Sequence, residues 1–262
     1  MKIFLYRKLP ENFDQDIYIW DVDKTYLHTN FESFKGLMNI LFEFAIDKTA
    51  IPGAKELLRE LRRGKESKIG LSPIFFISAS PVMLKKVLEG KFLIDGVQHD
   101  GIVLKDYRSL RRLLGKVRIK NNFPYKLMCL LTHRLLMPEK STEILFGDDF
   151  ERDADIYSLY ADILSHKIDR EGVKKYLLKE KLIKKEIEKI LALVEKNQKR
   201  SSKEVVKKIF IHQIKHQDPK WFLKYGDRLV ATQDYRQTAE ILYTMGKISK
   251  SGLKRISDSV WK

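Results

Sequence analysis

Two acidic clusters carry residue types that could do chemistry on a phosphate ester. Asp21, Asp23 and Thr25 lie in the segment DVDKT, directly after the apolar run DIYIW. A second acidic cluster, GDDFERD at 147–153, follows the apolar run EILF. One carboxylate can attack phosphorus while a second one donates and accepts the proton. Because a phosphate dianion repels such a nucleophile, the reaction also needs a divalent cation or other positive charge.

The spacing within DVDKT predicts a division of roles. We expect Asp21 to be the nucleophile that becomes an aspartyl-phosphate, which replaces one difficult displacement by two easier ones. Asp23 is placed to protonate the leaving oxygen and then to deprotonate the attacking water. We expect Thr25 to steady the loop through a side-chain hydrogen bond.

Between the two acidic clusters lie the residues that could bind the transferring phosphoryl group. Ser78, in the segment ISASP, is expected to donate a hydrogen bond to a phosphoryl oxygen, assisted by the backbone of Ala79 and Ser80. Lys126 lies early in a helical segment, about 20 residues before the second acidic cluster. Its ammonium group could neutralise negative charge on the phosphoryl group and on the aspartates.

The same acidic residues are candidates for holding Mg²⁺. This hard cation takes oxygen ligands and usually keeps several waters. We expect Asp21, the backbone carbonyl of Asp23, Asp148 and Asp153 to provide the protein ligands, with Asp149 as the alternative to Asp153.

Each of these residues also has a structural explanation. Asp-x-Asp is common in turns, serines and acidic residues frequently occupy helix N-termini, and Lys126 is one of many lysines. The order of the four motifs favours a functional site, because each follows an expected strand or lies on the intervening helix.

The hydrophobic pattern predicts alternating strands and helices. The expected strands are 16–20, 74–77, 102–104 and 143–146, and the expected helices are 31–46, 54–63, 83–93 and 126–136. Such alternation is typical of an α/β fold with a doubly wound, Rossmann-like parallel sheet. Ligands of these sheets bind beyond the carboxyl ends of the strands. Because Asp21, Ser78 and Asp148 each follow an expected strand, we expect them to lie together.

The chain is expected to have two parts. Residues 1–170 form the catalytic domain, in which 26–51 is a small helical insertion, too short for a full cap domain. Residues 171–262 form a basic α-helical C-terminal extension, with one helix over 174–197 predicted from its apolar stripe. This extension holds 23 lysines and arginines against 11 aspartates and glutamates, within a net charge of +16.

Composition narrows the class of protein. With 262 residues and 44% hydrophobic content, the chain can build a substantial core, and it contains no apolar run long enough to span a membrane. We expect a soluble protein that is not exported. The single cysteine, Cys129, cannot form an internal disulfide, which fits the cytoplasm.

The motifs resemble those of the haloacid-dehalogenase (HAD) superfamily and, more narrowly, the catalytic domain of the actin-patch-associated phosphatidate phosphatases. The similarity rests on DVDKTYLHT, IPGAKELL, FFISASP, GIVLKD and GDDFERDADIY, within residues 16–165. It implies a HAD-like fold and a magnesium-dependent phosphatase acting on phosphatidate. The sequence departs from the family pattern at Lys24, Val82-Met83 and Asp149-Phe150, which flank the pocket and bear on substrate choice.

Three interpretations of function follow. In the first, a lipid phosphatase places its basic helices on an anionic membrane surface. In the second, the substrate is a soluble phosphomonoester or a nucleic-acid end, which Trp221, Phe222 and Tyr225 would permit although such aromatics are more often core. In the third, the chain is a non-catalytic binding module, which the intact Asp21 and Asp23 disfavour.

Overall fold

A computed structural model gives the arrangement of most of the chain. It describes residues 6–28, 49–65, 71–107, 122–200, 204–215 and 217–261. The helix expected over 31–46, and with it most of the insertion expected over 26–51, lies outside the described residues.

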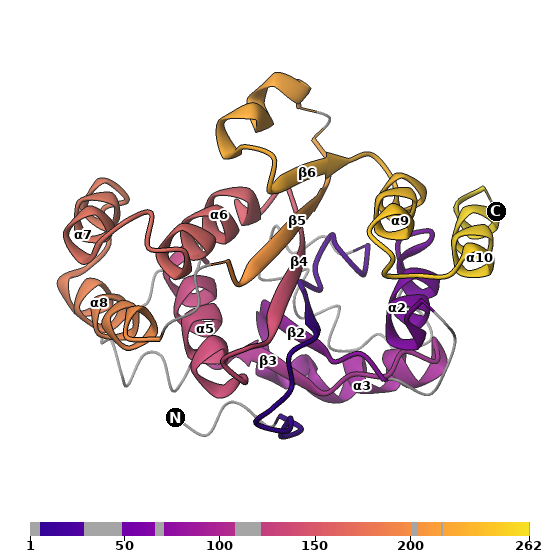
Figure 1. Cartoon of the computed structure of the whole chain (residues 1–262), viewed down its shortest axis with the longest axis horizontal. Coiled ribbons are helices and arrows are strands. Elements are labelled where there is room, and N and C mark those ends of the chain that lie inside the picture. Colours follow the sequence, from indigo (N-terminus) through magenta and orange to yellow (C-terminus); the bar gives the residue numbers. More distant parts are fainter. Residues whose placement is uncertain are drawn as a thin grey trace.

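Six strands in the described part of the chain form one parallel sheet (Figure 1). They are β1 (Asp16–Trp20), β2 (Ile74–Pro81), β3 (Gly101–Lys105), β4 (Thr142–Asp148), β5 (Val206–His212) and β6 (Leu229–Thr232). Their spatial order is β3-β2-β1-β4-β5-β6. After β1, the chain adds β2 and β3 on one side of this strand. It then places β4 on the other side of β1 and adds β5 and β6 beyond it. The predicted α/β fold with a doubly wound parallel sheet is confirmed.

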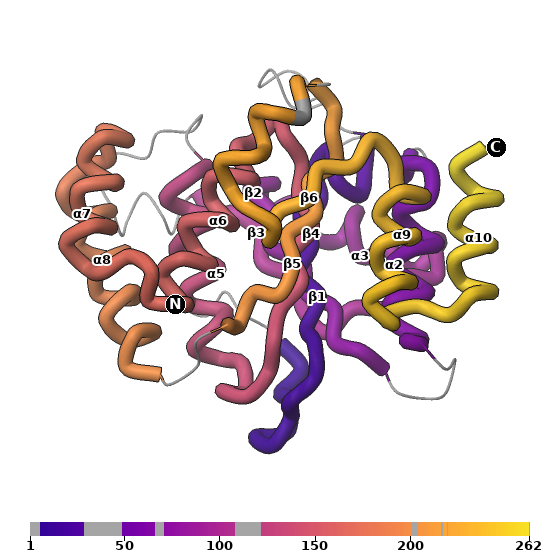
Figure 2. Tube along the Cα trace, turned by 45° about the horizontal axis from the view of Figure 1, so that its top comes forward, coloured from indigo at the N-terminus to yellow at the C-terminus, as the bar shows by residue number. Residues whose placement is uncertain are grey.

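Helices cover both faces of the sheet (Figures 1 and 2). One layer contains α5 (Phe123–Leu136), α6 (Asp153–Leu164), α7 (Arg170–Lys179) and α8 (Lys184–Gln198). The other contains α2 (Ala54–Arg63), α3 (Lys85–Ile94), α9 (Tyr235–Thr244) and α10 (Lys250–Val260). The short 3₁₀ helices are η2 (Val82–Leu84) and η3 (Pro219–Tyr225).

Alternate residues of each central strand enter two different cores. In β1, Ile17 and Ile19 pack with the α5–α8 layer, whereas Tyr18 and Trp20 pack with the opposite layer. A strand buried on both faces reads as a continuous apolar run, because neither set of alternating side chains meets water. This explains the sequences DIYIW and EILF.

A row of stacked aromatic rings fixes how three strands align. Trp20, Phe146 and Phe210 occupy paired positions on β1, β4 and β5. The rings of Trp20 and Phe146 lie 4.3 Å apart at 15°, and those of Phe146 and Phe210 lie 5.2 Å apart at 16°. A slip of one residue would turn these rings to the other face. The register therefore determines which residues emerge beside one another at the ends of β1 and β4.

The expectation that residues 171–262 form only helices is wrong. Both β5 and β6 belong to this part of the chain and extend the sheet beyond β4. The segment VKKIFIH of β5 carries lysines near its start, but Ile209, Phe210 and Ile211 are buried between the helical layers. The division of the chain at residue 170 stays a prediction, although the sheet continues across it.

The single helix expected over 174–197 is also wrong. Its apolar stripe is divided between α7 and α8, and Lys181 between them adopts a positive φ of 54°. The connection redirects the chain so that both helices place their apolar sides, including Leu177 and Ile190, in the same core.

The C-terminal helices pack against the helix that follows the Pro-Gly turn. Gly53 directly precedes α2 and has a φ of 84°. A Cβ at this position would lie 2.8 Å from Val260 and 2.9 Å from Tyr235. Arg255 of α10 binds the buried Glu60 of α2 at 2.7 and 2.9 Å. The end of the chain therefore completes the α2 side of the fold.

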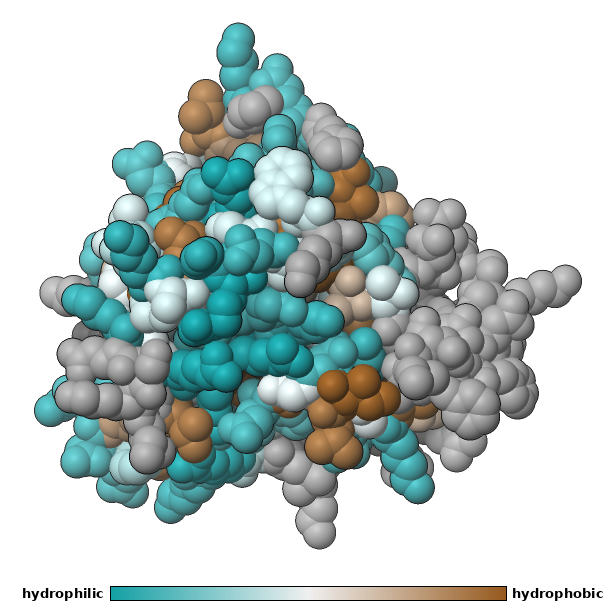
Figure 3. Space-filling model, turned by 90° about the vertical axis from the view of Figure 1, so that its right-hand side faces the viewer, coloured by the Kyte–Doolittle hydropathy of each residue, from teal (hydrophilic) through white to brown (hydrophobic). Residues whose placement is uncertain are grey.

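The face formed by α9 and α10 is largely hydrophilic, with separate hydrophobic residues among the polar ones (Figure 3). Among the described residues, no helix combines the length and apolar character needed to cross a membrane.

We predict that the core around β5 contributes strongly to stability. Ile209 is fully buried, so Ile209→Ala should lower the free energy of unfolding by about 2–5 kcal/mol, because it leaves a cavity between β5 and the α5–α8 layer. Leu178→Ala on the exposed side of α7 should change it by less than about 0.5 kcal/mol. Denaturant unfolding measures both, and equal effects would contradict the placement of β5 in the sheet.

Candidate active site

The predicted site residues gather where the strand order reverses. Asp21 directly follows β1, and Asp148 is the last residue of the neighbouring β4. Ser78 lies within β2, not after it, because β2 continues to Pro81. This edge of the sheet lies between two diverging crossover connections, where doubly wound folds commonly bind ligands.

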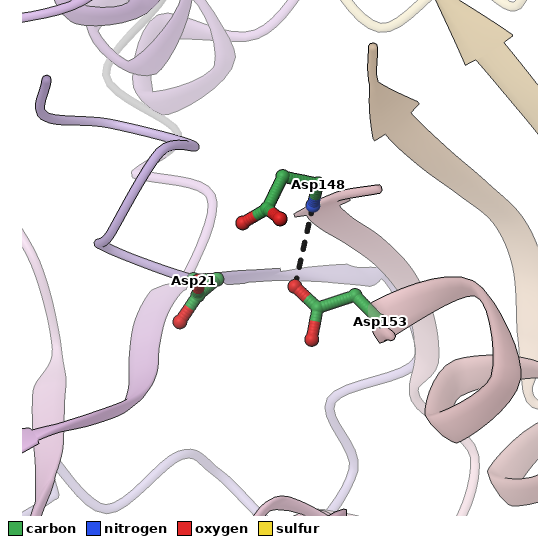
Figure 4. Close-up of side chains that lie close together, drawn as sticks. All are labelled: Asp21, Asp148 and Asp153. Atoms are coloured by element: carbon green, nitrogen blue, oxygen red, sulfur yellow. Dashed lines mark hydrogen bonds between the residues drawn. The ribbon is translucent and has the colours of Figure 1, made fainter. Parts of the chain in front are cut away.

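Three aspartates form a compact buried group at this edge (Figure 4). Asp21, Asp148 and Asp153 each contribute a carboxylate oxygen that lies within 4.8 Å of the other two. They come from the end of β1, the end of β4 and the start of α6. All three side chains are fully buried, so their charges are poorly screened by water.

Lys126 joins this group from α5. Its Nζ lies 2.6 Å from Asp153, 3.0 Å from Glu151 and 3.2 Å from Asp21. Burial alone would lower the pKa of Lys126, but attraction by Asp153, Asp21 and Glu151 raises the pKa well above its usual value. The side chain is therefore a permanent positive charge inside the site.

The sheet positions the backbone of Asp21, while its carboxylate pairs with Lys126 without a hydrogen bond. Its N–H donates to the carbonyl of Phe146 at 2.9 Å, as a continuation of the β1–β4 ladder. Neither carboxylate oxygen accepts a hydrogen bond from a described residue. Burial, helped by repulsion from Asp153, Glu151 and Asp148 and opposed by Lys126, raises the pKa of Asp21 well above its usual value.

The second acidic loop is shaped around Asp148 and Asp153. One Asp148 oxygen accepts from the N–H groups of Phe150 and Glu151, at 2.6 and 3.0 Å. The N–H of Asp148 donates to Asp153 at 3.2 Å. Gly147 permits this close approach, because a Cβ there would lie 2.5 Å from the Asp153 carboxylate. Burial and then Asp153 raise the pKa of Asp148 to about 8.

The balance of charge in this group fits a divalent cation. Lys126 forms ion pairs with Asp21, Glu151 and Asp153, and Asp148 adds a fourth carboxylate beside Asp21 and Asp153. Burial raises the pKa of Asp21, Asp148 and Asp153, because loss of water disfavours their charged forms. A buried group of carboxylate oxygens, in which Asp21 accepts no hydrogen bond from a described residue, is suited to a hard metal ion.

Asp23 is close in sequence to Asp21, but its carboxylate contacts two serines of β2. Its Oδ2 accepts hydrogen bonds from the hydroxyl of Ser78 at 3.1 Å and from the hydroxyl of Ser80. The Ser78 hydroxyl also accepts from the N–H of Ser80 at 3.0 Å. The carboxylate of Asp23 is not part of the three-aspartate group, which leaves its backbone carbonyl as the predicted metal contact. The two serines orient the predicted proton carrier.

Thr25 connects the first acidic loop to β4 and to the C-terminal helices. Its hydroxyl donates to Asp148 at 3.3 Å, as expected for a residue that steadies the loop. Its carbonyl accepts from the buried hydroxyl of Tyr235 in α9. Ala79 is buried in β2 between the two serines.

The two candidates for the last metal ligand are clearly separated. The carboxylate of Asp149 accepts from the N–H groups of Ile214 at 2.8 Å and Lys215 at 3.1 Å, and so holds the segment after β5. Asp153 instead faces Asp21 and Lys126. The geometry favours Asp153 over Asp149.

Sequence reasoning missed a polar chain beside the site. Lys105, at the end of β3, donates to Asn122 at 2.9 Å, and Asn122 donates to Glu151 at 3.3 Å. Burial lowers the pKa of Lys105 to about 8, although attraction by Glu151 opposes this shift. A lysine that ends the apolar strand GIVLK was a detectable signal, since it lies at the same sheet edge as Asp21. Glu151 was hidden among three other acidic residues in its loop.

Comparison with known proteins gives one finding. The family model for phosphatidate phosphatase APP1, catalytic domain, matches residues 17–170, which include every predicted site residue and exclude β5, β6, α9 and α10. Neither the curated proteins nor the solved structures yield a match. The family is one of phosphatases, which are hydrolases, and its match covers more than half of the chain. We conclude that this chain belongs to the family of the phosphatidate phosphatase APP1 catalytic domain.

Proposed function

We propose that this chain is a magnesium-dependent phosphatase of the HAD type that hydrolyses phosphatidate to diacylglycerol and phosphate through an aspartyl-phosphate. The proposal rests on Asp21. Its buried carboxylate accepts no hydrogen bond from a described residue and lies 3.2 Å from the ammonium group of Lys126. A nucleophilic oxygen needs an accessible lone pair and a nearby positive charge. Membership of the family supports phosphatase activity.

In the first step, an oxygen of Asp21 attacks phosphorus. The bond between phosphorus and the ester oxygen breaks, and the leaving oxygen takes a proton from Asp23. In the second step, Asp23 removes a proton from water, whose oxygen attacks the phosphorus. The bond to Asp21 then breaks and phosphate leaves. The same carboxyl group serves as acid and then as base, so the cycle returns the site to its starting state.

Ser78 and Ser80 would hold Asp23 ready for both proton transfers. Each hydroxyl donates to the same oxygen of Asp23, so the two serines fix the orientation of this carboxylate. We propose that the Ser78 hydroxyl turns to a phosphoryl oxygen when substrate is bound, with backbone N–H groups near Ala79 assisting.

Positive charge would compensate for the phosphate. Lys126 is already placed beside Asp21 and Asp153, so it can stabilise negative charge on the phosphoryl group. Asp21, the Asp23 carbonyl, Asp148 and Asp153 would hold Mg²⁺, which when bound supplies further neutralisation and orients the phosphate.

The proposed substrate places the enzyme at the cytoplasmic surface of a membrane. The family description names phosphatidate, a phosphomonoester carried by a lipid. The net charge of +16 favours approach to an anionic lipid surface.

Removing the nucleophile should abolish turnover. Asp21→Asn should reduce Mg²⁺-dependent phosphate release from an aryl phosphate by about 10³-fold or more, because an amide oxygen cannot form the acyl phosphate. Asp14→Asn, which changes an exposed carboxylate before β1, should retain wild-type activity. A wild-type protein that releases no phosphate, or an active Asp21→Asn variant, would contradict the proposal.

The substrate class is tested separately in the same assay. Phosphatidate in mixed micelles should be hydrolysed with higher kcat/KM than a soluble sugar phosphate. The reverse preference would retain the phosphatase mechanism and reject the lipid substrate.

Mg²⁺ should also stabilise the fold, because it relieves repulsion among buried carboxylates. At about 100 times its dissociation constant, it should raise the free energy of unfolding by about 2.7 kcal/mol, measured by thermal or denaturant unfolding. Asp153→Asn should abolish this gain. Asp149→Asn should keep it, because that carboxylate binds the backbone of Ile214 and Lys215. Equal gains in both variants would contradict the assigned ligands.

A further inference from the structure

The η3 segment is attached to the protein by one of its sides. Phe222 is buried in the core of the α5–α8 layer, and the Tyr225 hydroxyl donates to Asp155 at 2.7 Å. A 3₁₀ helix repeats every three residues, so these two side chains lie on the same side. At the start of the helix, Asp218 accepts from the N–H of Lys220 at 2.8 Å. The segment is therefore held in a defined orientation.

Its remaining sides present apolar and basic groups to water. Leu223 is 75% exposed and Trp221 is 37% exposed, while Lys220 and Lys224 on either side are also exposed. The Lys224 ammonium lies 3.8 Å from the centre of the Trp221 ring. Within the described part of the chain, neither lysine has an ion-pair partner. We call Lys220, Trp221, Leu223 and Lys224 the η3 surface.

The η3 surface is connected to the rim of the active site. η3 follows the C-terminal end of β5 and projects at the top of the molecule in Figure 1. The chain between them is held by Asp149, which accepts from the backbone of Ile214 and Lys215. Lys215 also lies 4.7 Å from the Phe150 ring, whose centre is 2.7 Å from the ammonium group of Lys24. Further lysines thus lie against the second acidic loop, which carries Asp148 and Asp153.

We propose that the η3 surface docks on a bilayer containing anionic phospholipids and brings the active-site edge to that bilayer. The proposal rests on the proposed function, because only a lipid-borne phosphate ester requires the site to approach a membrane. It identifies the contact as a short aromatic and basic helix, in place of the long basic helices expected from the sequence.

The chemistry of the η3 surface matches a lipid interface. Tryptophan favours the boundary between headgroups and acyl chains, leucine can enter the apolar layer, and lysines pair with anionic headgroups. Some cations of α7 and α8, by contrast, are paired with acidic neighbours. Arg170 lies 2.6 Å from Glu195, and Lys174 lies 3.5 Å from Glu171.

Co-sedimentation with vesicles tests the docking surface directly. The vesicles contain phosphatidylcholine with or without phosphatidylserine, an anionic lipid that is not the proposed substrate, so binding is measured without turnover. Wild type should sediment with the phosphatidylserine vesicles. Trp221→Ala/Leu223→Ala and Lys220→Glu/Lys224→Glu should each weaken binding by about ten-fold or more, because each removes apolar contact or favourable charge.

The matched control changes the same apolar residue types elsewhere. Leu178 and Trp261 are 56% and 74% exposed on other parts of the described surface, so Leu178→Ala/Trp261→Ala should bind vesicles as wild type does. Trp221 contacts the rings of Phe222 and Tyr225, so Leu223→Ser serves as a second variant that spares this packing. All η3 variants should release phosphate from a soluble aryl phosphate at the wild-type rate.

Three results would overturn the docking surface. In the first, the wild type fails to sediment with phosphatidylserine vesicles. In the second, the control and the η3 variants lose binding equally. In the third, the wild type binds a single-stranded oligonucleotide but not vesicles. Vesicle binding that depends on the η3 surface, in a wild type that releases no phosphate from any substrate, would uphold the surface and reject the proposed function. Loss of vesicle binding with intact aryl phosphatase activity in the η3 variants is the result we expect.

Discussion

The buried ammonium group of Lys126 is the charge on which the site depends. It lies within 3.2 Å of Asp21, Glu151 and Asp153, which approach from β1, the loop after β4 and the start of α6. Carboxylates this close and this deeply buried repel one another, and burial raises the pKa of Asp21 and Asp153. Removing one partner of such a buried network commonly costs about 3–5 kcal/mol. Lys126 thus joins three separate elements around the carboxylate of Asp21.

The sheet provides the precision that this electrostatic arrangement needs. Trp20, Phe146 and Phe210 stack across β1, β4 and β5, and the residues that follow the first two rings begin the acidic loops. The C-terminal third supports the same edge, because Tyr235 donates to the Thr25 carbonyl and the segment after β5 is held by Asp149. The chain beyond the family match therefore contributes to the shape of the site as well as to the fold.

Much of this arrangement could be predicted from local pattern. Buried parallel strands read as apolar runs, so the strands before Asp21 and Asp148 were visible in the sequence, as was the doubly wound sheet. The choice between Asp149 and Asp153 was not, because it depends on where α6 begins and on the close approach allowed by Gly147. The strand β5 was not predicted, because lysines near its start hide its apolar character although packing buries the strand. The turn at Lys181 was not predicted either, because the apolar stripe continues through it without a Gly or Pro.

We propose that the phosphoryl group is transferred to Asp21 before it is released as phosphate. Asp23→Asn should slow hydrolysis of the intermediate by removing the base that activates water, so the phosphorylated protein should accumulate. Mass spectrometry of this variant, quenched in acid after mixing with an aryl phosphate and Mg²⁺, measures the intermediate directly. We predict a phosphoryl group on the peptide that contains Asp21, and its loss in Asp21→Asn/Asp23→Asn. A phosphoryl group on another residue, or none in a variant that still releases phosphate, would contradict the account.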